Sequence, residues 1–193
     1  MSIHAKLRRE TAADHQRIES SLDLLKPTLS LGEYRCVLRK FYGFYKPLEQ
    51  RLQNAAPAAE VGFAIPSRSP LLARDLAALG EPERNIAAAP CCEHLPAVAS
   101  VAQVAGCVYV TEGATLGGRL IARALARSLG LSRDNGARFF VGADAATGAA
   151  WKRTLSWLED VVRAGADPDA VVTSARETFR AFHEWLAMPE QIR

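Results

Sequence analysis

Apolar residues recur along this chain every three to four positions, and no stretch alternates between apolar and polar residues as a half-buried strand would. After Ser30, for example, Tyr34, Val37, Leu38 and Phe41 fall on one helical face. The pattern predicts six helices, over about residues 3–25, 31–52, 71–79, 97–129, 147–163 and 167–187. We therefore expect an all-α protein in which glycines interrupt the middle of one long helix.

Signals for helix ends support these boundaries. The sequence Ser30-Leu31-Gly32-Glu33 has the spacing of a capping box, in which Ser30 and Glu33 bond each other's backbone N–H groups. Gly130 is suited to close the long helix, and Asp167 followed by Pro168 is suited to begin the last one. Turns are predicted at 135–136 and 142–148.

Composition indicates one soluble domain over residues 1–193. The chain is 49% hydrophobic and 23% charged, which is typical of a globular protein and excludes a disordered one. The net charge of +3 comes from basic residues spread among acids, so nucleic acid is not an expected partner. Four cysteines without a C-x-x-C pair suit reduced thiols.

The sequence also predicts a cytoplasmic protein that does not enter a membrane. The N-terminal residues MSIHAKLRRETAADHQ contain no apolar segment of the kind found in a signal peptide. The longest apolar region, 97–125, includes the polar Gln103 and the charged Glu112, Arg119 and Arg123, and such residues are too costly inside a bilayer.

The stretch TEGATLGGRLI, residues 111–121, places Gly113, Gly117 and Gly118 where the helical pattern is strongest. Each glycine inside a helix costs about 1 kcal/mol relative to alanine, so the trio weakens the helix by about 3 kcal/mol. Three explanations are open: another helix packs closely here, the helix bends, or a flat ligand lies against the bare backbone. Gly118 is assigned to the bend.

A partner for such a ligand is found in LRRETAADHQRIES, residues 7–20. His15 and Glu19 are four residues apart, and Arg8 precedes His15 by seven, so the three share one helical face. A neutral imidazole can bind haem iron while a carboxylate holds its other nitrogen. The alternative is an exposed histidine that forms only a surface pair with Glu19.

Together, LRRETAADHQRIE and VYVTEGATLGGRLIARAL resemble the haem oxygenase family, most closely its soluble bacterial members, including those that supply biliverdin to bacteriophytochromes. The resemblance extends to residues 130–158. It implies a haem b molecule between an N-terminal proximal helix and a glycine-interrupted distal helix. His15 then takes the place of the iron ligand, and Glu19 that of the carboxylate behind it.

The same resemblance assigns roles to further residues. Gly113 and Gly117 correspond to the distal glycines that leave room for oxygen. Arg8 and Tyr109 fall where the family places partners for the haem propionates, and Lys152 is a third candidate. Phe179 is expected to line the pocket.

The implied reaction is the oxygen-dependent degradation of haem to biliverdin, carbon monoxide and ferrous iron, in which haem is both substrate and cofactor. It requires an external electron donor, such as a reductase or a ferredoxin-type protein. A bacteriophytochrome is a possible acceptor of the product.

One position departs from the family pattern. Where other members carry aspartate or serine after the first distal glycine, this chain has Ala114, which cannot hold a water molecule. Backbone groups or Thr115 would have to organise water there. Two alternatives to an active enzyme therefore stay open: a haem-binding or haem-sensing relative without turnover, and a thiaminase-II-like enzyme with Cys107 as its nucleophile.

Overall fold

The computed structural model describes residues 2–55, 62–142 and 145–189, without the side chains of 115–116 and 145–147. The helices are α1 (Ile3–Glu10), α2 (Ala12–Leu22), α3 (Leu31–Asn54), α5 (Ser69–Ala78), α6 (Glu83–Ala87), α7 (Val101–Leu129), α8 (Arg138–Val141), α9 (Ala145–Arg163) and α10 (Pro168–Ala187). No strand occurs in this part of the chain. The all-α prediction is confirmed, although the short helices α6 and α8 were not predicted.

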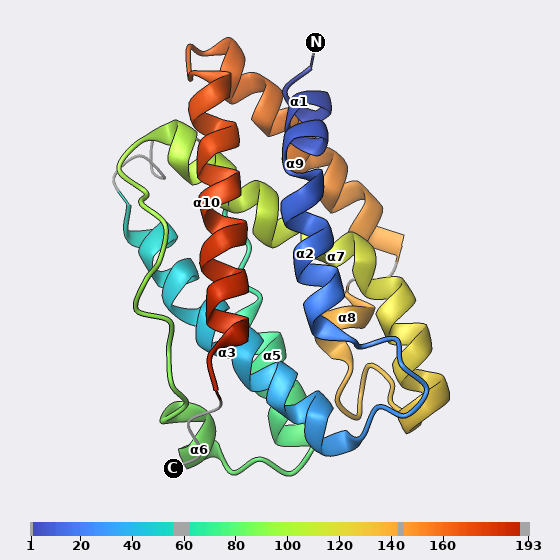
Figure 1. The fold of residues 1–193 in the computed structure, drawn as a ribbon. Coiled ribbons are helices and arrows are strands. Elements are labelled where there is room, and N and C mark those ends of the chain that lie inside the picture. The colour runs from blue at the N-terminus through green and yellow to red at the C-terminus, as the bar shows by residue number, and fades with distance from the viewer. Residues whose placement is uncertain (1, 56–61, 143–144, 190–193) are drawn as a thin grey trace.

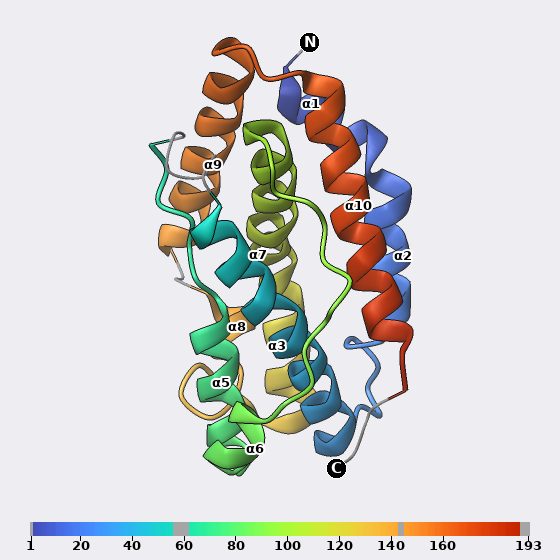
Figure 2. The ribbon, with the colours of Figure 1, turned by 90° about the vertical axis from the view of Figure 1, so that its left-hand side faces the viewer.

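The long helices pack around α7. Figure 2 shows α7 at the centre, with α9 on one side and α10 on the other. The α7–α10 pair forms the most extensive helix–helix packing, and α2 packs on α10 (Figure 1). Helix α1 bridges α9 and α10, while α3 packs on α5. This arrangement places α1 and α2 across from the middle of α7.

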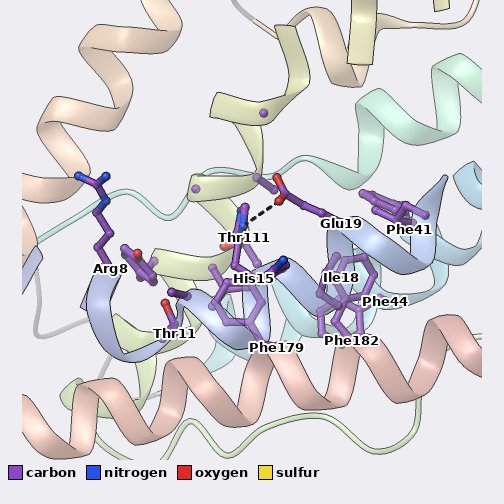
Figure 3. Close-up of a pocket in the computed structure, with 18 of the residues that line it drawn as sticks. Arg8, Thr11, His15, Ile18, Glu19, Phe41, Phe44, Thr111, Phe179 and Phe182 are labelled. Atoms are coloured by element: carbon purple, nitrogen blue, oxygen red, sulfur yellow. Dashed lines mark ion pairs between the residues drawn. The ribbon is translucent and has the colours of Figure 1, made fainter. Parts of the chain in front are cut away.

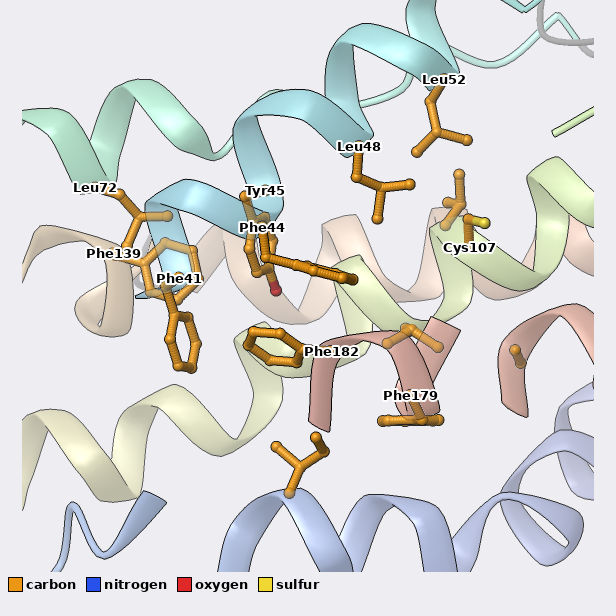
Figure 4. Close-up of a cluster of buried hydrophobic side chains, with 14 of the residues drawn as sticks. Phe41, Phe44, Tyr45, Leu48, Leu52, Leu72, Cys107, Phe139, Phe179 and Phe182 are labelled. Carbon is orange, nitrogen blue, oxygen red and sulfur yellow. The ribbon is translucent and has the colours of Figure 1, made fainter. Parts of the chain in front are cut away.

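A cluster of aromatic rings links α3, α8 and α10 in the core (Figure 4). The ring of Phe182 lies 4.6 Å from that of Phe44 and 5.0 Å from that of Phe41. Phe139 in turn lies 5.4 Å from Tyr45, in an edge-to-face arrangement. All five rings are buried, so this cluster holds the three helices together beside α7.

The N-terminal helix differs from the prediction at two points. Thr11 separates α1 from α2, and its hydroxyl donates to the Leu7 carbonyl oxygen at 2.8 Å, a bond that bends helices. Helix α2 ends at Leu22, whereas the predicted helix continued to Leu25. The chain turns here because Asp23 adopts a left-handed conformation with φ 43°. Aspartate tolerates that conformation better than most residues.

Other boundaries were partly predicted. The capping box of Ser30, the left-handed Gly130 and the cap at Asp167 are all confirmed. Helix α7 begins at Val101, four residues later than predicted, because Ser100 accepts the N–H of Gln103 as its N-cap. Helix α9 begins at Ala145, inside the predicted turn over 142–148.

Helix α7 is continuous through its glycines, so the predicted interruption is not a break in the helix. Two of its glycines allow close packing. A Cβ atom on Gly106 would lie 2.6 Å from Ser174 Cβ and from the Val171 carbonyl oxygen of α10. A Cβ atom on Gly118 would lie 2.5 Å from the Phe140 carbonyl oxygen of α8. Gly118 therefore serves the docking of α8, a role that the predicted bend does not include.

Within the described residues, no helix is both long and apolar enough to cross a membrane. Cys36, Cys91, Cys92 and Cys107 are all free thiols.

Candidate functional site

A cavity of about 660 Å³ lies between α1–α2 and the middle of α7, with α10 along one side (Figure 3). Residues from α3, α8 and α9 complete its lining. The volume is in the range of sites that hold cofactors and other small molecules, about 300–1,000 Å³. Of the predicted site residues, Arg8, His15, Glu19, Tyr109, Gly113, Gly117 and Phe179 line it.

His15 stands on the α2 wall of this cavity. Its Nδ1 lies 3.6 Å from Oε2 of Glu19, one turn further along α2 (Figure 3). The pair is close enough for an electrostatic contact but slightly beyond a hydrogen bond. The His15 ring also meets Phe179 edge to face, with 5.9 Å between centroids. These two contacts orient the imidazole, and because Glu19 approaches Nδ1, Nε2 is left for a ligand.

The wall opposite His15 is the glycine-containing part of α7. Among the described residues, a Cβ atom on Gly117 would meet no atom within 4 Å, and one on Gly113 would meet only the ring of Trp151, at 3.6 Å. Ala114 lies between them on the cavity lining. At Gly113, Ala114 and Gly117 the helix presents backbone and one methyl group, so a flat ligand can approach α7 closely at these positions.

Polar groups gather at one end of the cavity. Arg8 is exposed there, and Tyr109 and Thr11 lie next to it on the lining. Burial raises the pKa of Tyr109, while a hydrogen bond with Thr11 and the charge of Arg8 oppose that shift. Tyr109 is therefore a neutral hydroxyl beside a permanent cation, a pair suited to bind a carboxylate.

The other end of the cavity is apolar. Figure 3 places Arg8 at one end of the row of labelled residues and Phe41 at the other. The apolar end is lined by Leu22, Phe41, Phe44, Ile121, Phe140 and Phe182. A ligand with charged groups on one edge and hydrocarbon on the other would therefore bind in one orientation.

Two of the predicted site residues are not placed in this cavity. Lys152 is exposed and absent from the described lining, which Trp151 joins in its place. Consecutive helical residues point about 100° apart, and of these two it is Trp151 that faces the cavity. Thr115 lies within α7, but its side chain is outside the part of the chain that is described.

Several residues that line the cavity were not predicted. Phe182 lies one turn after Phe179, and His4 lies one turn before Arg8, so helical periodicity from the predicted residues would have found both. Trp151 and Phe140 come from α9 and α8, and no local signal connects these helices with His15.

Cys107 is buried where α7 meets α10. Its thiol accepts a hydrogen bond from Thr178 at 3.3 Å, and burial raises its pKa. It is not among the described residues that line the cavity. A fully buried, protonated thiol is a poor nucleophile, so this geometry does not favour the thiaminase-like alternative.

The whole chain is similar to known haem oxygenases. The sequence model of the family "Heme oxygenase" matches residues 1–188. A haem oxygenase of Xanthomonas campestris is 33% identical over 156 residues, which are 80% of this chain and 88% of that protein.

Solved structures show the same fold. Haem oxygenase from Leptospira interrogans has a TM-score of 0.75 at 20% identity, with 97% of this chain and 99% of that chain covered. Haem oxygenase-1 from the cyanobacterium Synechocystis, solved in complex with haem, has a TM-score of 0.67 at 16% identity, with 96% and 91% covered. Since the family match spans nearly the whole sequence, the chain belongs to the haem oxygenase family of haem-degrading enzymes.

Proposed function

We propose that this cavity binds haem b and that the chain converts it, with molecular oxygen, to biliverdin, carbon monoxide and ferrous iron. The observation that carries the proposal is the pair of opposed walls, an oriented imidazole on α2 facing bare helix backbone on α7. When bound, haem supplies both the redox-active iron and the carbon skeleton that is cleaved.

The residues present fit haem. His15 offers an imidazole nitrogen on the α2 wall of the cavity, and its side chain is 52% exposed, so Nε2 is accessible. Glu19 favours the tautomer with its proton on Nδ1, which leaves the Nε2 lone pair for iron. Phe179 restricts rotation of the ring by its edge-to-face contact. These residues would hold the metal and set its orientation.

The α7 wall leaves space for oxygen. A side chain larger than hydrogen at Gly113 or Gly117 would project toward the ligand, whereas the glycines keep that side free. Thr111 is also on the lining, but its hydroxyl lies 3.2 Å from the Cys107 carbonyl and donates within its own helix. The proposal therefore requires that backbone groups, or Thr115, organise water beside Ala114.

Arg8 and Tyr109 would bind the propionates. Placing the two carboxylates at this polar end directs the hydrocarbon edge of the ring toward the aromatic cluster of α3, α8 and α10. The aromatic end excludes water, while orientation by the carboxylates determines which edge of the ring is oxidised.

The reaction also needs partners. Electrons would come from an external reductase or ferredoxin-type protein, and the oxygen atoms would end in the bile pigment, carbon monoxide and water. We propose a cytoplasmic location, as the reduced cysteines favour, and a bacteriophytochrome as one possible acceptor of biliverdin.

The second candidate function is haem binding or sensing without turnover. It is favoured by Ala114, which supplies neither a donor nor an acceptor on the oxygen side. The two functions share the iron ligand and differ in the fate of the bound haem.

One experiment tests both candidates. Hemin is added to the purified protein and to the His15→Ala variant, and the Soret band is recorded before and after a reductant and oxygen are supplied. We expect a Soret band that depends on His15, followed by formation of bile pigment. A stable oxygen complex without bile pigment would support the second candidate, and a Soret band unchanged in the variant would exclude His15 as the ligand.

A further inference from the structure

His4 is a second histidine on the lining of the cavity, and the activity proposed above gives it no role. It lies in the first turn of α1, one helical turn before Arg8. Its backbone N–H lies 3.4 Å from Oε1 of Glu159 in α9. No hydrogen bond or ion pair links its ring nitrogens to another residue of the described chain. A partly buried imidazole is thus available at the polar end.

The position of the His4 ring is fixed by an aromatic wall. The ring meets Trp151 edge to face, with 6.1 Å between centroids and an interplanar angle of 81°. Trp151 in turn lies 5.8 Å from Tyr109. The row His4, Trp151 and Tyr109 therefore closes the same end of the cavity as Arg8.

We propose that His4 donates a hydrogen bond to one haem propionate while Arg8 and Tyr109 bind the other, and this inference rests on the proposed haem-binding function. Either neutral tautomer of imidazole carries one N–H donor, so the contact does not require protonation. Residues four apart on a helix are neighbours, about 5–6 Å apart at Cβ, so His4 and Arg8 can each reach one of two carboxylates on adjacent pyrroles. His4 thus supplies the contact that was predicted for Lys152.

The negative charge of the propionates can be removed without changing the rest of the ring, which leaves ester carbonyl groups that are weaker acceptors of this bond. The test measures the equilibrium affinity of the full-length protein for hemin and for hemin dimethyl ester, whose carboxylates are esterified. The variant His4→Phe keeps an aromatic ring against Trp151 but has no N–H donor. The variant His4→Gln replaces the ring with an amide that still donates. Circular dichroism shows whether each variant is folded.

We expect His4→Phe to bind hemin about tenfold more weakly, as for the loss of a hydrogen bond to a charged group, and to lose clearly less affinity for the dimethyl ester, whose carbonyl groups are neutral acceptors. His4→Gln should recover most of the loss. Arg8→Ala should show the same selectivity for the free acid, whereas the control Lys152→Ala should change neither affinity.

Two results would overturn the role of His4. An equal loss for hemin and the ester would mean that His4 acts only through packing, and no loss in His4→Phe would mean that it does not contact a propionate. Failure of the proposed function looks different, because the wild type would then show no His15-dependent Soret band with either porphyrin.

Discussion

Four glycines of helix α7 form two pairs that differ in what surrounds them. Gly106 and Gly118 are pressed against other helices, where an added Cβ atom would lie 2.5–2.7 Å from atoms of α10 or α8. Gly113 and Gly117 face the cavity, where a Cβ atom would meet no described residue closely: at Gly113 it would make ordinary contact with the Trp151 ring, at 3.6 Å. The first pair is required for packing, and the second pair is not.

The difference between the two pairs shows where α7 is less stable than it could be. A glycine at a close contact stabilises the fold, because only hydrogen fits there. A glycine facing open space lowers helix stability by about 1 kcal/mol relative to alanine, and no close packing in the ligand-free protein offsets this cost. The cost at Gly113 and Gly117 is understandable only if something else must approach the helix there, and the proposed haem and its oxygen meet that requirement.

The largest effect on stability is expected at Gly106, one of the two closely packed glycines. Gly106→Ala should lower the free energy of unfolding by about 3 kcal/mol, because its methyl group meets the Val171 carbonyl and the Ala175 nitrogen, backbone atoms that can move only with α10. Chemical denaturation of the ligand-free protein measures the change. A loss below about 1 kcal/mol would show that α7 and α10 can separate at low cost.

The next effect concerns the helix that docks on Gly118. Asp75 is 1% exposed and accepts the N–H groups of Arg138 and Phe139 at 2.8 and 2.7 Å, which caps α8. Burial raises the pKa of this carboxyl group to about 6, although the two N–H donors oppose the shift. The folded state therefore binds a proton more readily than the unfolded chain, and the stability this provides is lost as pH rises through about 6.

The comparison of wild type with Asp75→Asn isolates this contribution. The stability of the wild type relative to the variant should fall by about 2 kcal/mol between pH 4.5 and 7, since each pKa unit corresponds to about 1.4 kcal/mol. Denaturation curves of both proteins across this range measure it. If the two stabilities change in parallel with pH, Asp75 does not titrate in the range that its burial implies.

At Gly117, which faces the cavity, we expect a smaller change in stability, and of opposite sign. Gly117→Ala should raise the free energy of unfolding of the ligand-free protein by about 1 kcal/mol, because the methyl group meets no atom of the described residues within 4 Å and alanine favours the helix. Hemin affinity should fall at the same time, as the methyl group projects toward the ligand. Gly106→Ala is the matched control, since it should lower stability. Gain of stability with unchanged hemin affinity would contradict the distal role of Gly117.

Local signals in the sequence were sufficient for much of the fold. The capping box at Ser30, the C-cap at Gly130 and the N-cap at Asp167 each involve residues within a few positions, and each is confirmed. By contrast, α5 begins earlier than predicted because Glu49, on α3, accepts the N–H groups of Arg68 and Ser69. Caps supplied from another helix leave no local pattern, which also explains why α8 was missed.

The site residues that were predicted also depend on local signals, and those that were missed depend on tertiary packing. Arg8, His15 and Glu19 were found because one helical face carries all three. Trp151 was missed in favour of its neighbour Lys152, because the rotation of α9 about its axis is set by tertiary packing. The sequence likewise assigned Gly118 to a bend and did not show its packing role, since that role depends on where α8 docks.

The smallest effect on stability is expected at Glu19, on the α2 wall of the cavity. Glu19 is 65% exposed and His15 is 52% exposed, so Glu19→Gln should change the free energy of unfolding by less than about 0.5 kcal/mol. The hemin complex should respond more clearly, because an amide attracts the Nδ1 proton less strongly than a carboxylate does and makes Nε2 a weaker donor to iron. Resonance Raman spectroscopy of the reduced complex should show a lower iron–histidine stretching frequency. An unchanged frequency would mean that Glu19 leaves the imidazole unaffected, and the contact with Phe179 alone would then orient His15.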